Sequence, residues 1–187
     1  MTPINAATFF DHIRTELFAG SLTAAQVDGT NAILTAWPDG TDTRFVAYAL
    51  ATAFHETDST MEPIPEWGHG RGRPYGVPCG PYGHVYYGRG YVQLTWIKNY
   101  QRAEQEIPGS DLVRTPDNAL KPDIAAEIMI RGMTEGWFTG KKLADYFNAA
   151  SCDWVNARRI INGLDKAAQI AAYASHFWHA LTAAPNS

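Results

Sequence analysis

The chain has 187 residues, of which 45% are hydrophobic and 18% charged, and its formal net charge is −4. These values are typical of one globular domain with a sizeable core, and the lack of a Lys/Arg-rich run argues against a nucleic-acid partner. The sequence shows no apolar run of about 18 residues and no basic start followed by an apolar stretch, so we expect neither stable membrane insertion nor a signal peptide.

Helices are predicted throughout the N-terminal part. Apolar residues at three-to-four spacing predict the first helix over 6–17, and Thr23 begins the capping-box pattern of a second. A third helix is predicted over 43–56, where small residues on one stripe indicate close packing inside the domain. Glu56 therefore lies at the C-terminal end of a buried helix, which gives a carboxylate a rigid support and access to a cleft.

A long loop follows this helix. Of the 28 residues in 63–90, 13 are Gly or Pro. Loops of this length inside a compact domain tend to be functional. A linker between domains is disfavoured because the segment carries Tyr, Trp and His in place of Ser and charges. We expect at most a small β-hairpin, around 86–95.

The remaining sequence returns to helical patterns, so the whole chain reads as mainly α. A turn is predicted at 115–117, and Asn162 with Gly163 ends one of the helices. The predicted helices cover 97–106, 122–137, 143–147, 153–162 and 166–181.

Two carboxylates are the candidate catalytic groups. Glycoside hydrolysis uses a pair of acids, which inverting enzymes hold about 6.5–9.5 Å apart to leave room for water. Glu56 at a helix end and Glu66 in the loop, ten residues later, can meet that spacing. We expect Glu56 to be the acid and Glu66 the base, with Glu62 as a rival base. The plainer alternative is that Glu56 pairs with an Arg and that Glu66 is a solvated loop acid.

Four motifs resemble glycoside hydrolase family 19, which includes plant chitinases and many phage endolysins and has a lysozyme-like α fold. They are Phe-His-Glu-Thr (54–57), Met-Glu-Pro-Ile-Pro-Glu-Trp-Gly (61–68), Tyr-Tyr-Gly-Arg-Gly-Tyr-Val-Gln-Leu-Thr-Trp-Ile-Lys-Asn-Tyr (86–100) and Arg-Arg-Ile-Ile-Asn-Gly (158–163). The resemblance spans roughly residues 43–180, and the N-terminal part looks more like the short bacterial and phage members than the plant enzymes.

The resemblance implies a role for each matching residue. Glu56 corresponds to the general acid, Glu66 to the general base, and Thr95 to the hydroxyl that helps to hold the attacking water. Three amides and two aromatic residues are implied as substrate contacts: Gln93, Asn99, Asn162, Tyr87 and Trp96.

The chain departs from the plant pattern near the base. Lys98 stands where plant members carry an aromatic residue. Asp165 is a candidate to replace a family Glu, while the apparent position of a family Arg reads Gln169. Arg89 and Arg159 are the candidates to take over that positive charge.

A zinc site is the main chemical competitor. Zinc accepts ligands of the types present in and before the loop, but the spacings His-Glu-x-x-His and Cys-x-x-Cys are absent, so we predict no metal and no cofactor. A carbohydrate-binding module without catalysis is the non-enzyme alternative, and the presence of both acids favours the enzyme. The candidate zinc ligands are His55, Glu56, His69, Cys79 and His84.

These observations predict one catalytic domain over 1–187, with a helical part at 1–56, a cleft loop at 57–96 and a second helical part at 97–187. The expected activity is that of an endolysin, a lysozyme-like enzyme that cleaves β-1,4 bonds of peptidoglycan with inversion at the anomeric carbon. Chitin is the alternative polymer. We expect a monomer that accumulates in the host cytoplasm before release and acts on the cell wall in the periplasm.

Overall fold

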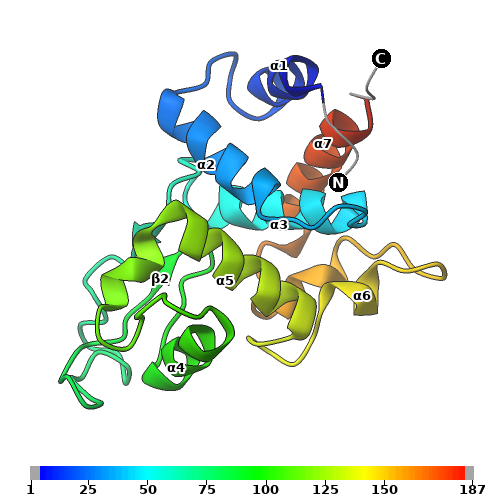
Figure 1. The fold of residues 1–187 in the computed structure, drawn as a ribbon. Helices are drawn as coiled ribbons and strands as arrows, with labels where there is room; N and C mark the ends of the chain where they lie inside the picture. The colour runs from blue at the N-terminus through cyan, green and yellow to red at the C-terminus, as the bar shows by residue number, and fades with distance from the viewer. Residues whose placement is uncertain (1–4, 184–187) are drawn as a thin grey trace.

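The computed structural model describes residues 5–183, and most of these are helical (Figure 1). A single pair of two-residue strands is found among them, so the prediction of a mainly α fold is confirmed. No helix within this range is both long and apolar enough to cross a bilayer. The α-helices are α1 (Ala6–Glu16), α2 (Ala24–Thr35), α3 (Thr43–Glu56), α4 (Ile97–Glu106), α5 (Pro122–Glu135), α6 (Leu143–Tyr146) and α7 (Ala167–Ala183); the 3₁₀ helices are η1 (Pro116–Leu120) and η2 (Asn156–Ile160), and the strands are β1 (Ile64–Pro65) and β2 (Arg89–Gly90).

Helix α3 lies in the middle of the molecule. Figure 1 shows α1 and α7 on one side of it and α4 and α5 on the other. Every residue from Val46 to Phe54 is buried, as expected for a helix enclosed by neighbours on all sides. The Asp42 side chain accepts a hydrogen bond from the Arg44 N–H and caps the start of the helix. This central helix delivers Glu56 to the position where the chain enters the cleft loop.

The two strands pair in an antiparallel register, with Ile64 opposite Gly90 and Pro65 opposite Arg89. They join the two ends of the cleft loop, a pairing that no strand pattern in the sequence predicts. The hairpin expected around 86–95 is present as one bridge between Arg89 and Leu94.

Two predictions of secondary structure, one of a helix and one of a turn, need correction. The segment predicted as a helix from Asp153 onward forms the 3₁₀ helix η2, at whose start the Asp153 side chain accepts hydrogen bonds from Asn156. The turn predicted at 115–117 leads into a second 3₁₀ helix, η1. A 3₁₀ helix has three residues per turn and is usually short, so an apolar pattern with a period of 3.6 residues does not predict it.

The buried side chains form one hydrophobic cluster, and the cleft loop contributes to it. Met61, Tyr86 and Tyr91 are fully buried and Leu94 is nearly so. The loop is therefore anchored at both of its ends by apolar packing, and the residues between the anchors form the site described below.

The cleft loop packs directly against Gly29 of α2. A methyl group at this position would lie 1.8 Å from the main-chain oxygen of Met61, so the backbone itself has to shift. We expect Gly29→Ala to lower the free energy of unfolding by about 2–3 kcal/mol in urea denaturation. Gly163→Ala is the matched control, because nothing lies within 4 Å of its added methyl. Equal stability of the two variants would contradict this packing.

Candidate active site

Glu56 is held by a buried arginine. Its side chain is 19% exposed, and its Oε1 accepts a hydrogen bond of 2.6 Å from Nη1 of Arg158, which is only 5% exposed. Arg158 lies on η2 and also donates from Nε to the main-chain oxygen of Asp165 at 3.3 Å. The end of α3 is thus tied to a segment 102 residues later in the sequence.

The arginines nominated from the sequence lie elsewhere. Arg89 pairs with Asp117 at 2.8 Å, and the exposed Arg159 donates to the Asn156 side chain at 3.3 Å. Neither forms an ion pair with Glu66, near which the sequence placed them. The alternative that Glu56 pairs with an Arg is confirmed, and the partner is Arg158, which the sequence analysis did not name. The sequence did contain a signal for Arg158. Two adjacent arginines stand between the apolar residues Ala157 and Ile160, so one of the two is expected to face the interior.

Glu66 is fixed at both carboxylate oxygens. Oε1 accepts a hydrogen bond of 2.8 Å from the Tyr75 hydroxyl, and Oε2 accepts one of 3.1 Å from the Gly88 N–H. The Glu66 N–H in turn donates to the Gly88 oxygen at 2.7 Å. Burial, the hydrogen bond to Glu66 and the charge of Glu66 raise the pKa of Tyr75, so its phenol stays protonated and remains a donor.

Gly88 lets two candidate residues approach from either side. A side chain there would meet Oε1 of Gln93 at 2.8 Å and Cβ of Glu66 at 3.3 Å. The Gln93 amide donates to the main-chain oxygens of Ile64 and Gly90, at 3.0 and 3.2 Å. Gln93 therefore supports the two-stranded sheet, and its oxygen lies next to the position that holds Glu66.

Several predicted contact residues share one cavity of about 330 Å³, here called the Thr95 cavity. Asn99 lines it and donates from Nδ2 to the Thr95 oxygen at 2.8 Å. Ile161, which follows η2, contributes to the same wall, one short helical turn beyond Arg158. The structure thus places four predicted site residues in one cavity near the support of Glu56: Gln93, Thr95, Trp96 and Asn99.

Two predicted contact residues do not line this cavity. The Tyr87 ring stacks on His69, with centroids 4.6 Å apart, and the Arg89 guanidinium lies 3.5 Å from its centroid. These two neighbours occupy the ring faces that a sugar would need. Asn162 is exposed, and its side-chain oxygen accepts a hydrogen bond from the Gly163 N–H.

A second cavity, here called the Glu66 cavity, measures about 460 Å³ and is lined by Thr57, Asp58, Thr60 and residues 64–69. Thr57 directly follows Glu56, so this cavity lies between the end of α3 and the candidate base. Glu62 is exposed and is not part of the lining, which favours Glu66 over Glu62 as the partner of Glu56.

Unusual backbone geometry is concentrated around these cavities. Nine described residues other than glycine have a positive φ, and six of them lie within 57–96, including Gln93 at 53° and Trp96 at 69°. Such conformations carry a cost and occur disproportionately at functional sites. This distribution supports the cleft loop as the site.

The candidate zinc ligands do not converge. Within residues 5–183, no group of three or more His, Cys, Asp or Glu side chains is placed to hold a metal ion. His69 stacks on Tyr87, the His84 ring contacts the Arg114 oxygen at 2.9 Å, and Cys79 is exposed with a free thiol.

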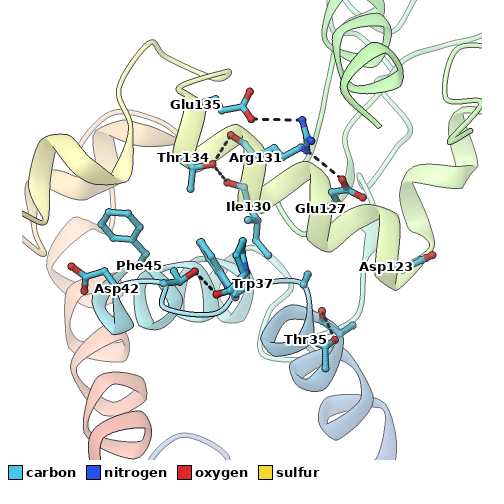
Figure 2. Close-up of a pocket in the computed structure, with 14 residues that line it drawn as sticks. Thr35, Trp37, Asp42, Phe45, Asp123, Glu127, Ile130, Arg131, Thr134 and Glu135 are labelled. Atoms are coloured by element: carbon cyan, nitrogen blue, oxygen red, sulfur yellow. Dashed lines mark hydrogen bonds and ion pairs between the residues drawn. The ribbon is translucent and has the colours of Figure 1, made fainter. Parts of the chain in front are cut away.

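A further cavity of about 810 Å³, larger than the Thr95 and Glu66 cavities, lies between the end of α2, the start of α3 and α5, and neither Glu56 nor Glu66 lines it. Trp37, Phe45 and Ile130 contribute apolar surface, and Figure 2 shows Arg131 between Glu127 and Glu135. Of the carboxylates that line it, Glu127 and Glu135 pair with Arg131, and Asp42 pairs with Arg44. Its size alone gives it no catalytic role.

We expect Arg158→Gln to leave Glu56 without its partner and to lower the free energy of unfolding by about 3 kcal/mol, because breaking a buried ion pair strands a charge. Arg159→Gln removes the same charge from the adjacent exposed position and is expected to change stability by less than about 0.5 kcal/mol. Urea denaturation of both variants checks this. Similar losses in the two would show that the ion pair does not stabilise the fold.

His55 gives stability a pH dependence. Burial lowers the pKa of His55. The unfolded chain therefore takes up a proton below about pH 6.5, while the folded chain takes it up only at lower pH. The contribution of neutral His55 to the free energy of unfolding is therefore complete above about pH 6.5. It is lost as the pH falls through the pKa of His55 in the folded chain. We expect His55→Gln to reduce the loss of stability on acidification, measured by urea midpoints, whereas the exposed His179→Gln leaves that loss unchanged.

No protein-family model matches the chain. Among curated proteins, it is 34% identical to Chitinase 3 of Oryza sativa subsp. japonica over 107 residues, 54% of this chain and 27% of that protein. It is 33% identical to Inactive chitinase-like protein 1 of Hevea brasiliensis over 82 residues, 43% of this chain and 22% of that protein. The chain thus matches less than two thirds of the length of these relatives, one of which is described as inactive.

Solved structures match almost the whole chain. Chitinase C from Streptomyces griseus superposes with a TM-score of 0.67 at 22% identity, covering 98% of this chain and 79% of the other. A bacterial family 19 chitinase superposes with a TM-score of 0.59 at 21% identity, covering 98% and 97%. These matches establish the fold, and the shared segments of sequence are chitinase-like.

Proposed function

We propose that this chitinase-like chain, which has the fold of the family 19 glycoside hydrolases, cleaves β-1,4 bonds between aminosugars by an inverting acid–base mechanism. One observation carries the proposal. A carboxylate on a buried helix end, Glu56, directly precedes Thr57 in the lining of the Glu66 cavity, and a carboxylate fixed on the loop, Glu66, lines the same cavity. Two carboxylates flanking a groove are the groups that this reaction requires.

Glu56 is proposed as the acid. Arg158 binds Oε1, and within the described residues Oε2 has no hydrogen-bond partner, so Oε2 is the oxygen that can carry the proton to the leaving group. After the proton has moved, the positive charge of Arg158 stabilises the carboxylate that forms. The ion pair thus favours transfer of the proton from Glu56 to the leaving oxygen.

Glu66 is proposed as the base that takes a proton from the attacking water. The hydrogen bonds from Tyr75 and Gly88 fix the orientation of its carboxylate. The Thr95 hydroxyl makes no hydrogen bond to another described residue and is free to hold the water. Attack on the anomeric carbon from the face opposite the leaving oxygen inverts its configuration.

The class of polymer follows from two different arguments. The relatives are named chitinases, which supports an N-acetylglucosamine polymer as substrate. Peptidoglycan also has a β-1,4 aminosugar backbone and is the second candidate, supported by the exposed cations Arg73 and Lys98 near the loop acid Glu66. A finding that purified protein cuts chitin oligomers but leaves peptidoglycan intact would remove the second candidate.

Glu56→Gln and Glu66→Gln are each expected to lower kcat by about 10²–10⁴-fold, since each removes one proton-transfer group. The measurement is the release of new reducing ends from chitin oligosaccharides and from purified peptidoglycan, with NMR of the first anomer formed. Glu62→Gln is the matched control and should retain activity, because Glu62 lies outside the Glu66 cavity.

Different results would point to other functions. Unchanged behaviour of the Glu56 variant in every assay would favour a carbohydrate-binding module. A first product with retained configuration would exclude water activation by Glu66. Clearing of peptidoglycan without new reducing ends would indicate an amidase or a peptidase.

A further inference from the structure

Positive charge is concentrated in the segment that carries the candidate base. The chain has 15 Lys and Arg residues against 19 Asp and Glu residues, but residues 63–102 hold five of the former and only one of the latter, Glu66. This segment therefore has a formal charge of +4, and the rest of the chain has −8. The five cations are Arg71, Arg73, Arg89, Lys98 and Arg102.

The cations differ in whether they are available to a ligand. Arg89 is buried and paired with Asp117. Arg73 and Lys98 are exposed, and neither forms an ion pair with any residue in 5–183. Internal pairing thus explains the position of Arg89 but not those of Arg73 and Lys98, nor those of Arg71 and Arg102, which are exposed as well.

These two cations flank the candidate cleft. Arg73 lies two residues before Tyr75, whose hydroxyl binds Glu66 and whose ring meets the edge of Trp96 at a centroid distance of 5.6 Å. Lys98 lies two residues after Trp96 and lines the Thr95 cavity. Because an extended residue spans at most about 3.6 Å, the Cα atom of Arg73 lies within two residue lengths of that of Tyr75, and the Cα atom of Lys98 within two residue lengths of that of Trp96.

The same edge continues along α4. Arg102 follows Lys98 by four residues, so the two side chains share one face of the helix. The Arg102 guanidinium lies 5.2 Å from the ring centroid of Trp137, and Trp137 lines the Thr95 cavity. A row of positive charge therefore borders the cavity that contains Thr95.

We propose that Arg73 and Lys98 form an anion-binding edge of the cleft that takes carboxylates carried on the side branches of the polysaccharide. Peptidoglycan carries such carboxylates on its peptides, whereas chitin is neutral. Charges of opposite sign at a partly desolvated surface attract each other and raise the local concentration of the substrate. The proposal rests on the proposed function and names Arg73 and Lys98 as the residues that select among its substrates.

The test compares native peptidoglycan, the same peptidoglycan with its carboxyl groups converted to neutral amides, and chitin hexamer. For the wild type, we expect kcat/KM on native peptidoglycan to fall with added salt and the values for the two neutral substrates to stay constant. The Arg73→Gln/Lys98→Gln double variant is expected to lose about tenfold in kcat/KM on native peptidoglycan through KM, a larger loss than on the neutral substrates. Arg73→Gln alone, at a residue outside the Thr95 cavity, is expected to stay within about twofold on the neutral substrates.

Arg14→Gln is the matched control, because it removes one exposed positive charge from α1, on the far side of α3 from α4 (Figure 1). It should leave all three substrates unaffected, and equal urea midpoints would show that all variants fold. Equal rates on native and amidated peptidoglycan, with no effect of the double variant, would overturn the anion-binding edge while the glycosidase proposal stands.

If no substrate yields new reducing ends, the glycosidase proposal fails, and co-sedimentation with native and amidated peptidoglycan then tests the edge by itself. Weaker binding of the double variant to the native polymer alone would support the anion-binding edge. Equal binding by the double variant and the wild type would overturn it.

Discussion

The ion pair between Glu56 and Arg158 is the contact on which the geometry of the site depends. It joins the last residue of the central helix to a 3₁₀ helix 102 residues away, and Ile161, one turn further on, forms a wall of the Thr95 cavity. Replacing a buried ion pair by apolar residues is often neutral for stability or better, so stability alone does not account for such a pair. Its distinctive effect here is to fix one carboxylate oxygen and leave the other accessible.

The base is fixed by different means, because it lies on a loop. A long loop loses conformational entropy when it is ordered, and the buried residues Met61, Tyr86 and Tyr91 offset that loss at its ends. Between these anchors, Glu66 and Gly88 exchange main-chain and side-chain hydrogen bonds across 22 residues. The candidate acid and the candidate base are thus both held in place, Glu56 by a helix and an arginine and Glu66 by hydrogen bonds across the loop.

Local signals in the sequence were sufficient for most of the helices. The bounds 43–56 and 97–106 agree with α3 and α4, because each begins after a clear change in pattern and ends where the chain becomes irregular. The capping box at Thr23 is also present. These features depend on residues a few positions apart, which is the range over which a helical period can be read.

The contacts that build the site are not local, and this is why the sequence did not predict them. The partner of Glu56 is 102 residues away, and the sequence suggested Arg89 and Arg159 only for a positive charge near Glu66, without naming Arg158 for Glu56. Tyr87 belongs to the motif that suggested a substrate contact, yet its ring is covered by His69 and a guanidinium. A motif identifies which residues belong to a site, whereas tertiary packing decides which of their faces and atoms remain free.

Cavity size and local charge lead to different conclusions about where a polymer binds. The cavity of about 810 Å³ has carboxylates along its lining, including Asp123, Glu127 and Glu135, and Arg131 is the one Lys or Arg in that lining (Figure 2). On the proposal above, a polymer that carries negative charge is repelled there and attracted to the exposed cations Arg73 and Lys98. The net charge of −4 would suggest repulsion everywhere. Because salt screens charges beyond about 8 Å at physiological ionic strength, the field close to the cleft, and not the total, decides which polymer approaches the two acids.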